Sequence, residues 1–158
     1  MSLLDLFRWL RHTSLSLQIQ HSTWDFAVIE MFHLLGLALL GGAMLIVDLR
    51  LLGIGLRRLP AAQVARQLLP VLLVGLGTML VSGALMVTAY PLKYYFNPWF
   101  RWKMLFLAFA VVVYFLLHRR IVRSHESLPT PAVSKLAALL SLTLWLCVGL
   151  AGRAIGIF

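Results

Sequence analysis

The sequence is poor in acidic residues and in cysteine. Of its 158 residues, five are Asp or Glu, fourteen are Lys or Arg, and Cys147 is the single cysteine. A lone cysteine can form no intrachain disulfide, so the chain is not a disulfide-stabilised domain. Charged residues of both signs make up only 12% of the chain, whereas 61% is hydrophobic and the mean hydropathy is +0.92. This composition excludes an ordinary soluble domain and indicates a membrane protein.

Short segments of alternating polar and apolar residues are also missing, which excludes a transmembrane β-barrel. The sequence has instead four apolar stretches of about 20 residues, each long enough to cross a hydrocarbon core of roughly 30 Å as an α-helix. The connections between these stretches are short, so consecutive helices should be antiparallel neighbours. We therefore predict an all-α fold: an integral membrane four-helix up-down bundle over residues 21–158, with spans near 26–49, 70–90, 98–121 and 135–157.

Residues 1–20 differ from the rest of the chain because they separate into an apolar and a charged face. The apolar face consists of Leu3, Leu6, Phe7 and Leu10. The charged face consists of Asp5, Arg8 and Arg11. This spacing predicts an N-terminal interfacial amphipathic helix. The segment lacks the continuous apolar core and the small-residue cleavage site of a signal peptide, so we expect the first span to insert uncleaved.

The formal net charge of +9 would suggest a nucleic-acid partner in a soluble protein. Here the cations gather at the ends of the apolar stretches, where they orient the chain in the lipid bilayer. Eight follow the first span or separate the third from the fourth, against six on the opposite side. The asymmetry predicts that both termini lie outside, and we expect no nucleic-acid partner.

Four ionisable residues interrupt otherwise apolar spans: Glu30, His33, Lys103 and Arg153. A charge inside a bilayer costs several kcal/mol on most scales, so such residues normally face the interior of a bundle and mark a site. With a rise of about 1.5 Å per residue, all four fall in one layer of the outer half. We predict that they reach a common chamber, in which Glu30 orients the His33 imidazole or relays a proton as a catalytic group.

The second span contributes a stripe of residues at a spacing of three to four: Gly75, Met79, Ser82, Met86 and Tyr90. Met86 falls at the depth of His33, and a thioether opposite an imidazole is a known haem-iron ligand pair. Lys103 and Arg153 are two cations that could neutralise the propionates of a porphyrin. The pattern predicts a haem b site with His33 as axial ligand, although a methionine stripe also suits a plain core.

His118 is a second candidate haem or metal ligand. It lies some 20 Å from His33 along the bilayer normal, a distance that one iron cannot bridge. With Tyr114 on the same helix face, and Asp48 and Arg50 near the same rim, His118 would belong to a separate inner site. The alternative is an interfacial histidine extended toward water among arginines.

Other functions stay open at the level of sequence. The charged layer could be a salt-bridge network, although buried ion pairs contribute little net stability. In a transport protein the same layer would bind a copper ion or a small anionic solute instead of haem, and copper would favour Met79, Met86 and His33 as soft ligands. An accessory structural subunit would pair the charged layer with a partner inside the membrane. The sequence also leaves a homo-oligomer open, and it contains no zinc-type ligand set.

Several short motifs resemble those of a small bacterial four-span family of unassigned function. They are Glu30-Met-Phe-His33-Leu-Leu-Gly36, Asp48-Leu-Arg50, Phe100-Arg-Trp-Lys103-Met-Leu-Phe-Leu and Gly152-Arg153. The chain is more distantly similar to the HemJ-type protoporphyrinogen IX oxidases and to the CopD-like copper resistance proteins. All of these share a histidine early in the first span.

The HemJ-type resemblance implies haem b and the oxidation of protoporphyrinogen IX to protoporphyrin IX. His33, Lys103 and Arg153 match that family's early histidine, its lysine opening the third span and its basic residue near the chain end, and Arg50 matches an arginine closing the first span. The family's third-span histidine falls on Tyr114, and its acidic, proline-containing motif before the last span has no counterpart here.

The function expected from the sequence is that of a membrane haem b or porphyrin-binding protein. Its role would be electron transfer or porphyrin oxidation, as a HemJ-like enzyme or another membrane oxidoreductase. Its partner would be an unidentified redox protein or a porphyrin substrate. The resemblance to a bacterial family places it in the inner membrane, with both termini periplasmic.

Overall fold

A computed structural model describes residues 2–22, 24–54, 58–123 and 131–157, without the side chains of residues 118–123 and 131. All regular elements in these ranges are α-helices. They are α1 (Leu3–Arg11), α2 (Ser14–His21), α3 (Asp25–Leu52), α4 (Ala61–Ala89), α5 (Pro91–Phe96), α6 (Pro98–Arg123) and α7 (Pro131–Ile157). The all-α prediction is confirmed.

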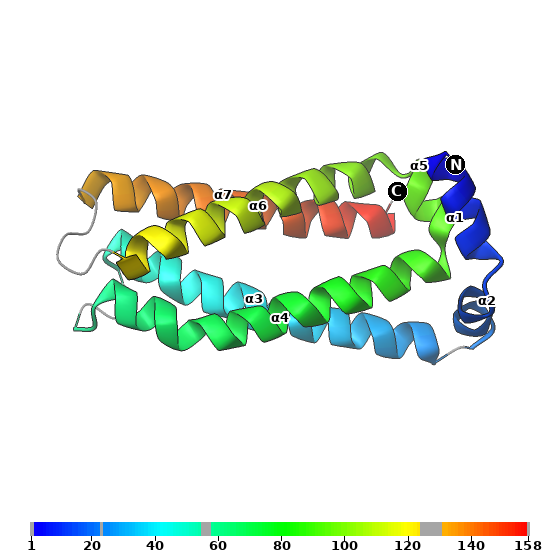
Figure 1. Cartoon of the computed structure of the whole chain (residues 1–158), viewed down its shortest axis with the longest axis horizontal. Coiled ribbons are helices and arrows are strands. Elements are labelled where there is room, and N and C mark those ends of the chain that lie inside the picture. The colour runs from blue at the N-terminus through cyan, green and yellow to red at the C-terminus, as the bar shows by residue number, and fades with distance from the viewer. Residues whose placement is uncertain (1, 23, 55–57, 124–130, 158) are drawn as a thin grey trace.

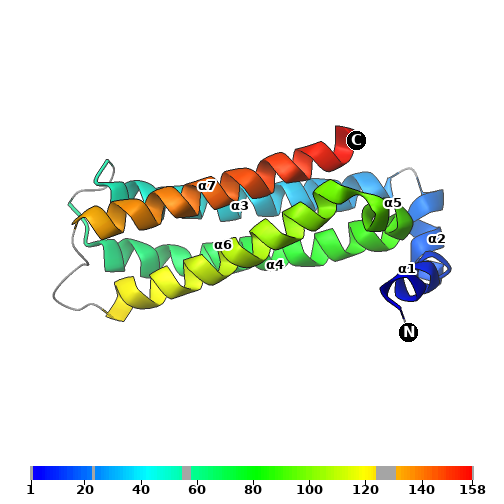
Figure 2. The ribbon, with the colours of Figure 1, turned by 90° about the horizontal axis from the view of Figure 1, so that it is seen from above.

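The helices α3, α4, α6 and α7 are long and apolar enough to cross a membrane. They form a bundle of two layers, with α3 and α4 in one layer and α6 and α7 in the other (Figure 1). The view from above looks onto α6 and α7, with α3 and α4 behind them, and places α1 and the end of α7 at the same end of the bundle (Figure 2). The chain is therefore a multi-pass membrane protein, and its two described ends lie on one side, as an even number of spans requires.

Helix α4 differs from the prediction at its start. The sequence predicted a span beginning near Pro70, whereas one helix runs from Ala61 through Pro70 to Ala89. Pro60 has an extended backbone and stands at the N-cap, where its missing N–H costs nothing. Pro70 removes one hydrogen bond from the helix interior, but membrane helices tolerate this loss because neighbouring groups compensate for it.

The close approach of α3 and α4 depends on two glycines. A Cβ built on Gly75 would lie 2.7 Å from the Leu40 backbone nitrogen, and one built on Gly36 would lie 3.1 Å from the Gly75 carbonyl oxygen. The two backbones therefore pack against each other without intervening side chains. In lipid no hydrophobic effect drives apolar helices together. Membrane helices therefore associate through close packing, which small residues at the contact allow.

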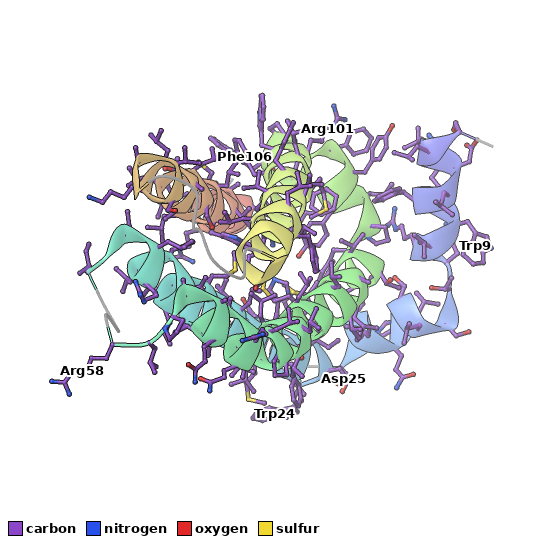
Figure 3. All side chains as sticks on the ribbon, turned by 60° about the vertical axis from the view of Figure 1, so that its left-hand side comes forward. Trp9, Trp24, Asp25, Arg58, Arg101 and Phe106 are labelled. Carbon is purple, nitrogen blue, oxygen red and sulfur yellow. The ribbon has the colours of Figure 1, made fainter. Side chains whose placement is uncertain are left out.

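The N-terminal segment forms two helices where the sequence predicted one amphipathic segment. His12 and Thr13 separate α1 from α2, and the Thr13 side chain accepts a hydrogen bond from the Ser16 N–H at the start of α2. Trp9 points away from the bundle and is 62% exposed (Figure 3). On the other side, Phe7 contacts Tyr95 of α5 with ring centroids 5.2 Å apart, and Gln20 of α2 donates to the Ala89 carbonyl at 2.7 Å. The helices α1, α2 and α5 thus cover one end of the bundle.

Candidate functional site

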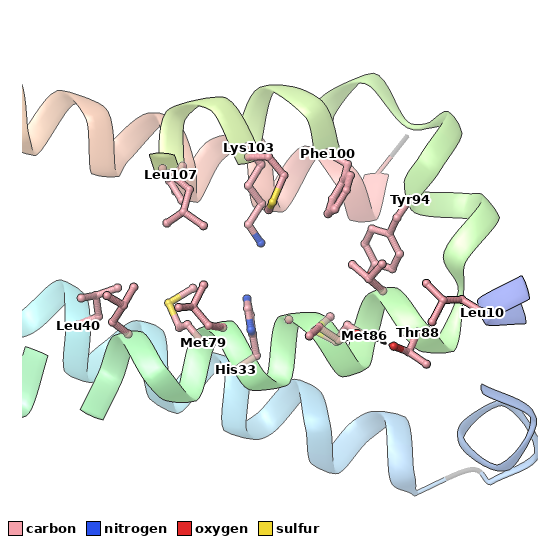
Figure 4. Close-up of a pocket in the computed structure, with 17 residues that line it drawn as sticks. Leu10, His33, Leu40, Met79, Met86, Thr88, Tyr94, Phe100, Lys103 and Leu107 are labelled. Carbon is pink, nitrogen blue, oxygen red and sulfur yellow. Dashed lines mark hydrogen bonds between the residues drawn. The ribbon is translucent and has the colours of Figure 1, made fainter. Parts of the chain in front are cut away.

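A cavity of about 390 Å³ lies between the two helix layers, near the end covered by α5. Figure 4 shows it between α4 on one side and α6 on the other. Its lining is apolar except for four side chains: His33, Thr88, Tyr94 and Lys103. Cavities of this size, apolar with a few polar groups, are typical of small-molecule sites.

His33 of α3 contributes an imidazole whose orientation is set by α4. The distance from His33 Nδ1 to Ser82 Oγ is 2.9 Å. Gly83 leaves room for the ring, since a Cβ at that position would lie 3.3 Å from His33 Cε1. The ring points across the cavity towards α6 (Figure 4).

The hydrogen bonds of Ser82 indicate which imidazole nitrogen carries the proton. The Ser82 hydroxyl donates its single proton to the Thr78 carbonyl, so its oxygen accepts from His33 Nδ1–H. The Met79 carbonyl, which can only accept, lies beside the same imidazole. The network therefore assigns the Nδ1–H tautomer, which leaves the lone pair of Nε2 available to a ligand.

Lys103 of α6 faces His33 from the opposite layer (Figure 4). Its amine lies against α7, where a Cβ built on Gly152 would be 3.5 Å from Lys103 Nζ. Among the residues whose side chains are described, no carboxylate acts on this half-buried ammonium. A partly buried cation without a counter-ion is costly, so the cavity offers a place for an anionic group.

The structure does not bring Glu30 and Arg153 into this cavity. Both side chains are exposed, and neither lines the cavity. Successive helix positions differ by 100° in direction, so Arg153 points away when its neighbour Gly152 faces Lys103. Glu30 lies close enough to Tyr94 of α5 to act on it electrostatically: burial, followed by the Glu30 charge, raises the pKa of the Tyr94 phenol.

Three methionine thioethers line the same cavity as His33. They belong to Met79 and Met86 of α4 and to Met104 of α6. Of the predicted stripe on the second span, Met79 and Met86 line the cavity and Ser82 holds the imidazole from behind. Gly75 packs against α3 instead, and Tyr90 is 40% exposed. The contribution of α5 was missed from sequence, because no periodic signal marks the six-residue helix that carries Tyr94.

The inner candidates lie away from the cavity. Tyr114 is buried in an apolar cluster with Leu40, Met44 and Leu72 and does not line the cavity. His118 follows one turn later on α6, and its side chain lies outside the described residues. Within the described part of the chain, no group of three or more His, Cys, Asp or Glu could hold a metal ion.

Comparisons with known proteins support the predicted membership of a family of unassigned function, but not the more distant resemblances. No curated protein and no solved structure matches the chain. Nothing among the matches links it to the HemJ-type or CopD-like families. The matching family model covers residues 7–158, nearly the whole length. The chain therefore belongs to the DUF6644 family, a family of unknown function.

Proposed function

We propose that the cavity binds haem b or a related porphyrin, with His33 Nε2 as an axial ligand. The observation that carries this proposal is the Ser82–His33 hydrogen bond of 2.9 Å, which holds Nδ1 as the donor and directs a free nitrogen lone pair into an apolar cavity. Histidines that bind metals commonly donate their second ring N–H in this way, which fixes both tautomer and orientation.

The remaining lining residues fit a porphyrin in charge and polarity. The macrocycle is apolar, as are the side chains of Leu76, Phe100 and Leu107 that line the cavity. Lys103 would pair with one propionate carboxylate through a charge-assisted hydrogen bond. A bound haem would supply one-electron redox chemistry, while the chain's own residues would hold the iron ligand, neutralise the carboxylate and exclude water.

The likeness of His33 and Lys103 to the HemJ-type pattern supports a role in electron transfer or porphyrin oxidation. Because Arg153 is exposed, Lys103 is the one member of the predicted cation pair that lines the cavity. The resemblance to a bacterial family supports an inner-membrane location, and the distribution of Lys and Arg between the loops supports periplasmic termini, with the site in the outer half of the membrane.

A haemin titration of the purified protein in detergent tests the proposal. We expect a saturable, one-to-one shift of the Soret band and, after reduction, a sharp α band from ligated haem. Vesicles and detergent without protein provide the blank for nonspecific partitioning. A linear, non-saturating absorbance like that of the blank would reject haem binding.

Replacement of Ser82 tests the hydrogen bond behind the imidazole. We expect Ser82→Ala to weaken haem binding roughly 10- to 100-fold, the usual effect of losing such a partner, because the ring is no longer held in one tautomer. Thr88→Ala is the matched control, since Thr88 lines the cavity and its hydroxyl donates to the Ala84 carbonyl of its own helix. Equal affinities for haem in the Ser82→Ala variant and the wild type would contradict this role.

Lys103→Met tests the predicted carboxylate contact. Loss of one charge-assisted hydrogen bond, about 1.5–3 kcal/mol, should lower haem affinity roughly 10- to 100-fold. Haem dimethyl ester, which has no free carboxylates, should bind wild type and Lys103→Met with equal affinity. If the variant lost the same affinity for haem and for the diester, Lys103 would act through packing and not through its charge.

A second candidate function is copper(I) binding, because Met79, Met86 and Met104 line the cavity together with His33. Thioethers and imidazoles are ligands that copper(I) accepts. Competition with a chromophoric copper(I) chelator measures this affinity directly. Copper binding that disappears in the Met79→Leu and Met86→Leu variants, in a protein that fails the haemin titration, would favour this function over haem.

A further inference from the structure

A second group of polar side chains lies inside the bundle, apart from the His33 cavity. Asp48 of α3 and Ser141 of α7 are each only 2% exposed, and the Ser141 hydroxyl lies beside the Asp48 carboxyl. Tyr114 of α6 is near enough to feel the Asp48 charge, and Trp145 follows Ser141 by one turn on α7. None of these four residues lines the His33 cavity.

Three buried polar atoms of this group meet no donor or acceptor at hydrogen-bond geometry, although Ser141 lies beside Asp48: Asp48 Oδ2, Ser141 Oγ and Trp145 Nε1. Buried polar groups are nearly always satisfied, and each one left unpaired costs about 1–3 kcal/mol. These unpartnered donors and acceptors lie on two adjacent helices, α3 and α7. They therefore indicate that a proton on the carboxyl, together with a bound water, completes their hydrogen bonds.

The surroundings of Asp48 supply no positive charge from the described side chains. Helix α4 contributes apolar residues at this level, with Leu68 packed against the clusters on either side. Helix α6 contributes Tyr114, and α7 contributes Ser141 and Trp145, none of them cationic. Arg50 of α3 turns away and donates through Nε to the Leu59 carbonyl at 2.7 Å. Among the side chains that the structure describes, an ionised carboxylate here would find no counter-ion in its apolar surroundings.

The donor set fits a protonated acid better than a bound metal cation. A carboxylic acid offers one O–H donor and a carbonyl acceptor, which complement the Ser141 hydroxyl and the Trp145 indole N–H. The indole N–H is a donor only, so it opposes a cation, and calcium or magnesium would require about six oxygen ligands.

We propose that Asp48, Ser141 and Trp145 form a proton-binding site within the membrane, in which Asp48 carries a proton at neutral pH. The site lies about 22 Å from His33 along α3, at a rise of 1.5 Å per residue. Ala43 and Met44, which are buried in an apolar cluster with Leu72, lie between the two places along α3. The proposal stands whether or not the outer cavity binds haem.

Infrared spectroscopy of the full-length protein in lipid vesicles tests the proposal at neutral pH. A protonated carboxylic acid has a carbonyl stretch well separated from the amide bands, and a carboxylate does not. We expect one such band in the wild type, its loss in Asp48→Asn and a change of its frequency in Trp145→Phe. Glu30→Gln, which removes an exposed carboxyl from the same helix, should retain the band. Absence of the band in wild type, or its survival in Asp48→Asn, would overturn the proposal.

A second measurement does not depend on the folding of an Asp48 variant. The chain has three aspartates, so Asp5→Asn with Asp25→Asn leaves Asp48 as the one aspartate. With carbon-13 at the aspartate side-chain carboxyl, NMR at neutral pH should report the chemical shift of a protonated acid. The chemical shift of a carboxylate would reject the site. Neither measurement uses haem, so failure of this proposal and failure of the proposed function are distinguishable.

Discussion

His33→Ala should abolish the specific haem spectrum altogether. The substitution removes the imidazole whose Nδ1–H is held by Ser82, and no other histidine lines the cavity among the residues that the structure describes. Haemin added to the variant should give the absorbance of haem in empty detergent. The reduced α band of ligated haem should be missing in the same sample.

Two comparisons make this result specific. His21→Ala, at the exposed end of α2, and His118→Ala, beyond Tyr114 on α6, should each keep the wild-type spectrum. In His33→Gly, added imidazole should restore part of the α band by occupying the vacated position. If His118→Ala lost the spectrum while His33→Ala kept it, the ligand would lie at the inner end of the bundle.

Gly75→Ala should destabilise the bundle by about 1–3 kcal/mol, the usual cost of overpacking. The added methyl group would sit 2.7 Å from the Leu40 backbone nitrogen and 3.0 Å from the Gly36 carbonyl oxygen. Backbone atoms cannot move aside as a flexible side chain can, so α3 and α4 must separate. Denaturation in a graded detergent mixture, followed by circular dichroism, measures the change in the free energy of unfolding.

The matched control is Gly77→Ala, two positions later on the same helix. A Cβ at Gly77 meets no atom within 4 Å, so this variant should be as stable as the wild type or slightly more stable, since alanine favours helix. Equal destabilisation by both substitutions would show that helix propensity or lipid contact, and not the α3–α4 approach, controls stability at these positions.

The fold was largely predictable because a bilayer imposes a length on each span. Four apolar stretches with short connections allow few arrangements other than an up-down bundle, and the structure has α3, α4, α6 and α7 in that arrangement. The start of α4 was not predictable from Pro70 alone. Proline ends many soluble helices, but inside a membrane protein a helix can continue through it.

The sequence predicted the depth of the candidate site residues in the bilayer much better than it predicted the direction in which their side chains point. The helical rise places His33 and Lys103 at one level, and the structure places both in one cavity. Direction was harder because lipid-facing and core-facing residues are both apolar, so the periodicity that marks the buried face of a soluble helix is nearly lost. Glu30 and Arg153 share the level of His33 but are exposed.

The partners of His33 show a second limit of sequence reasoning. Ser82 was placed on the inward stripe of the second span, but its hydrogen bond to an imidazole 49 positions away depends on how α3 and α4 are rotated. That rotation follows from the contact of Gly36 with Gly75, which fixes both helices at once. The unpartnered atoms around Asp48 likewise become visible only when α3 and α7 are packed together.

The most direct test of the central claim is an optical spectrum of the protein purified from its own membranes without added cofactor. We predict Soret and α bands of b-type haem in the reduced-minus-oxidised difference, at close to one haem per chain. A colourless protein that also fails to take up haemin would contradict the claim that the cavity of His33 and Lys103 is a porphyrin site.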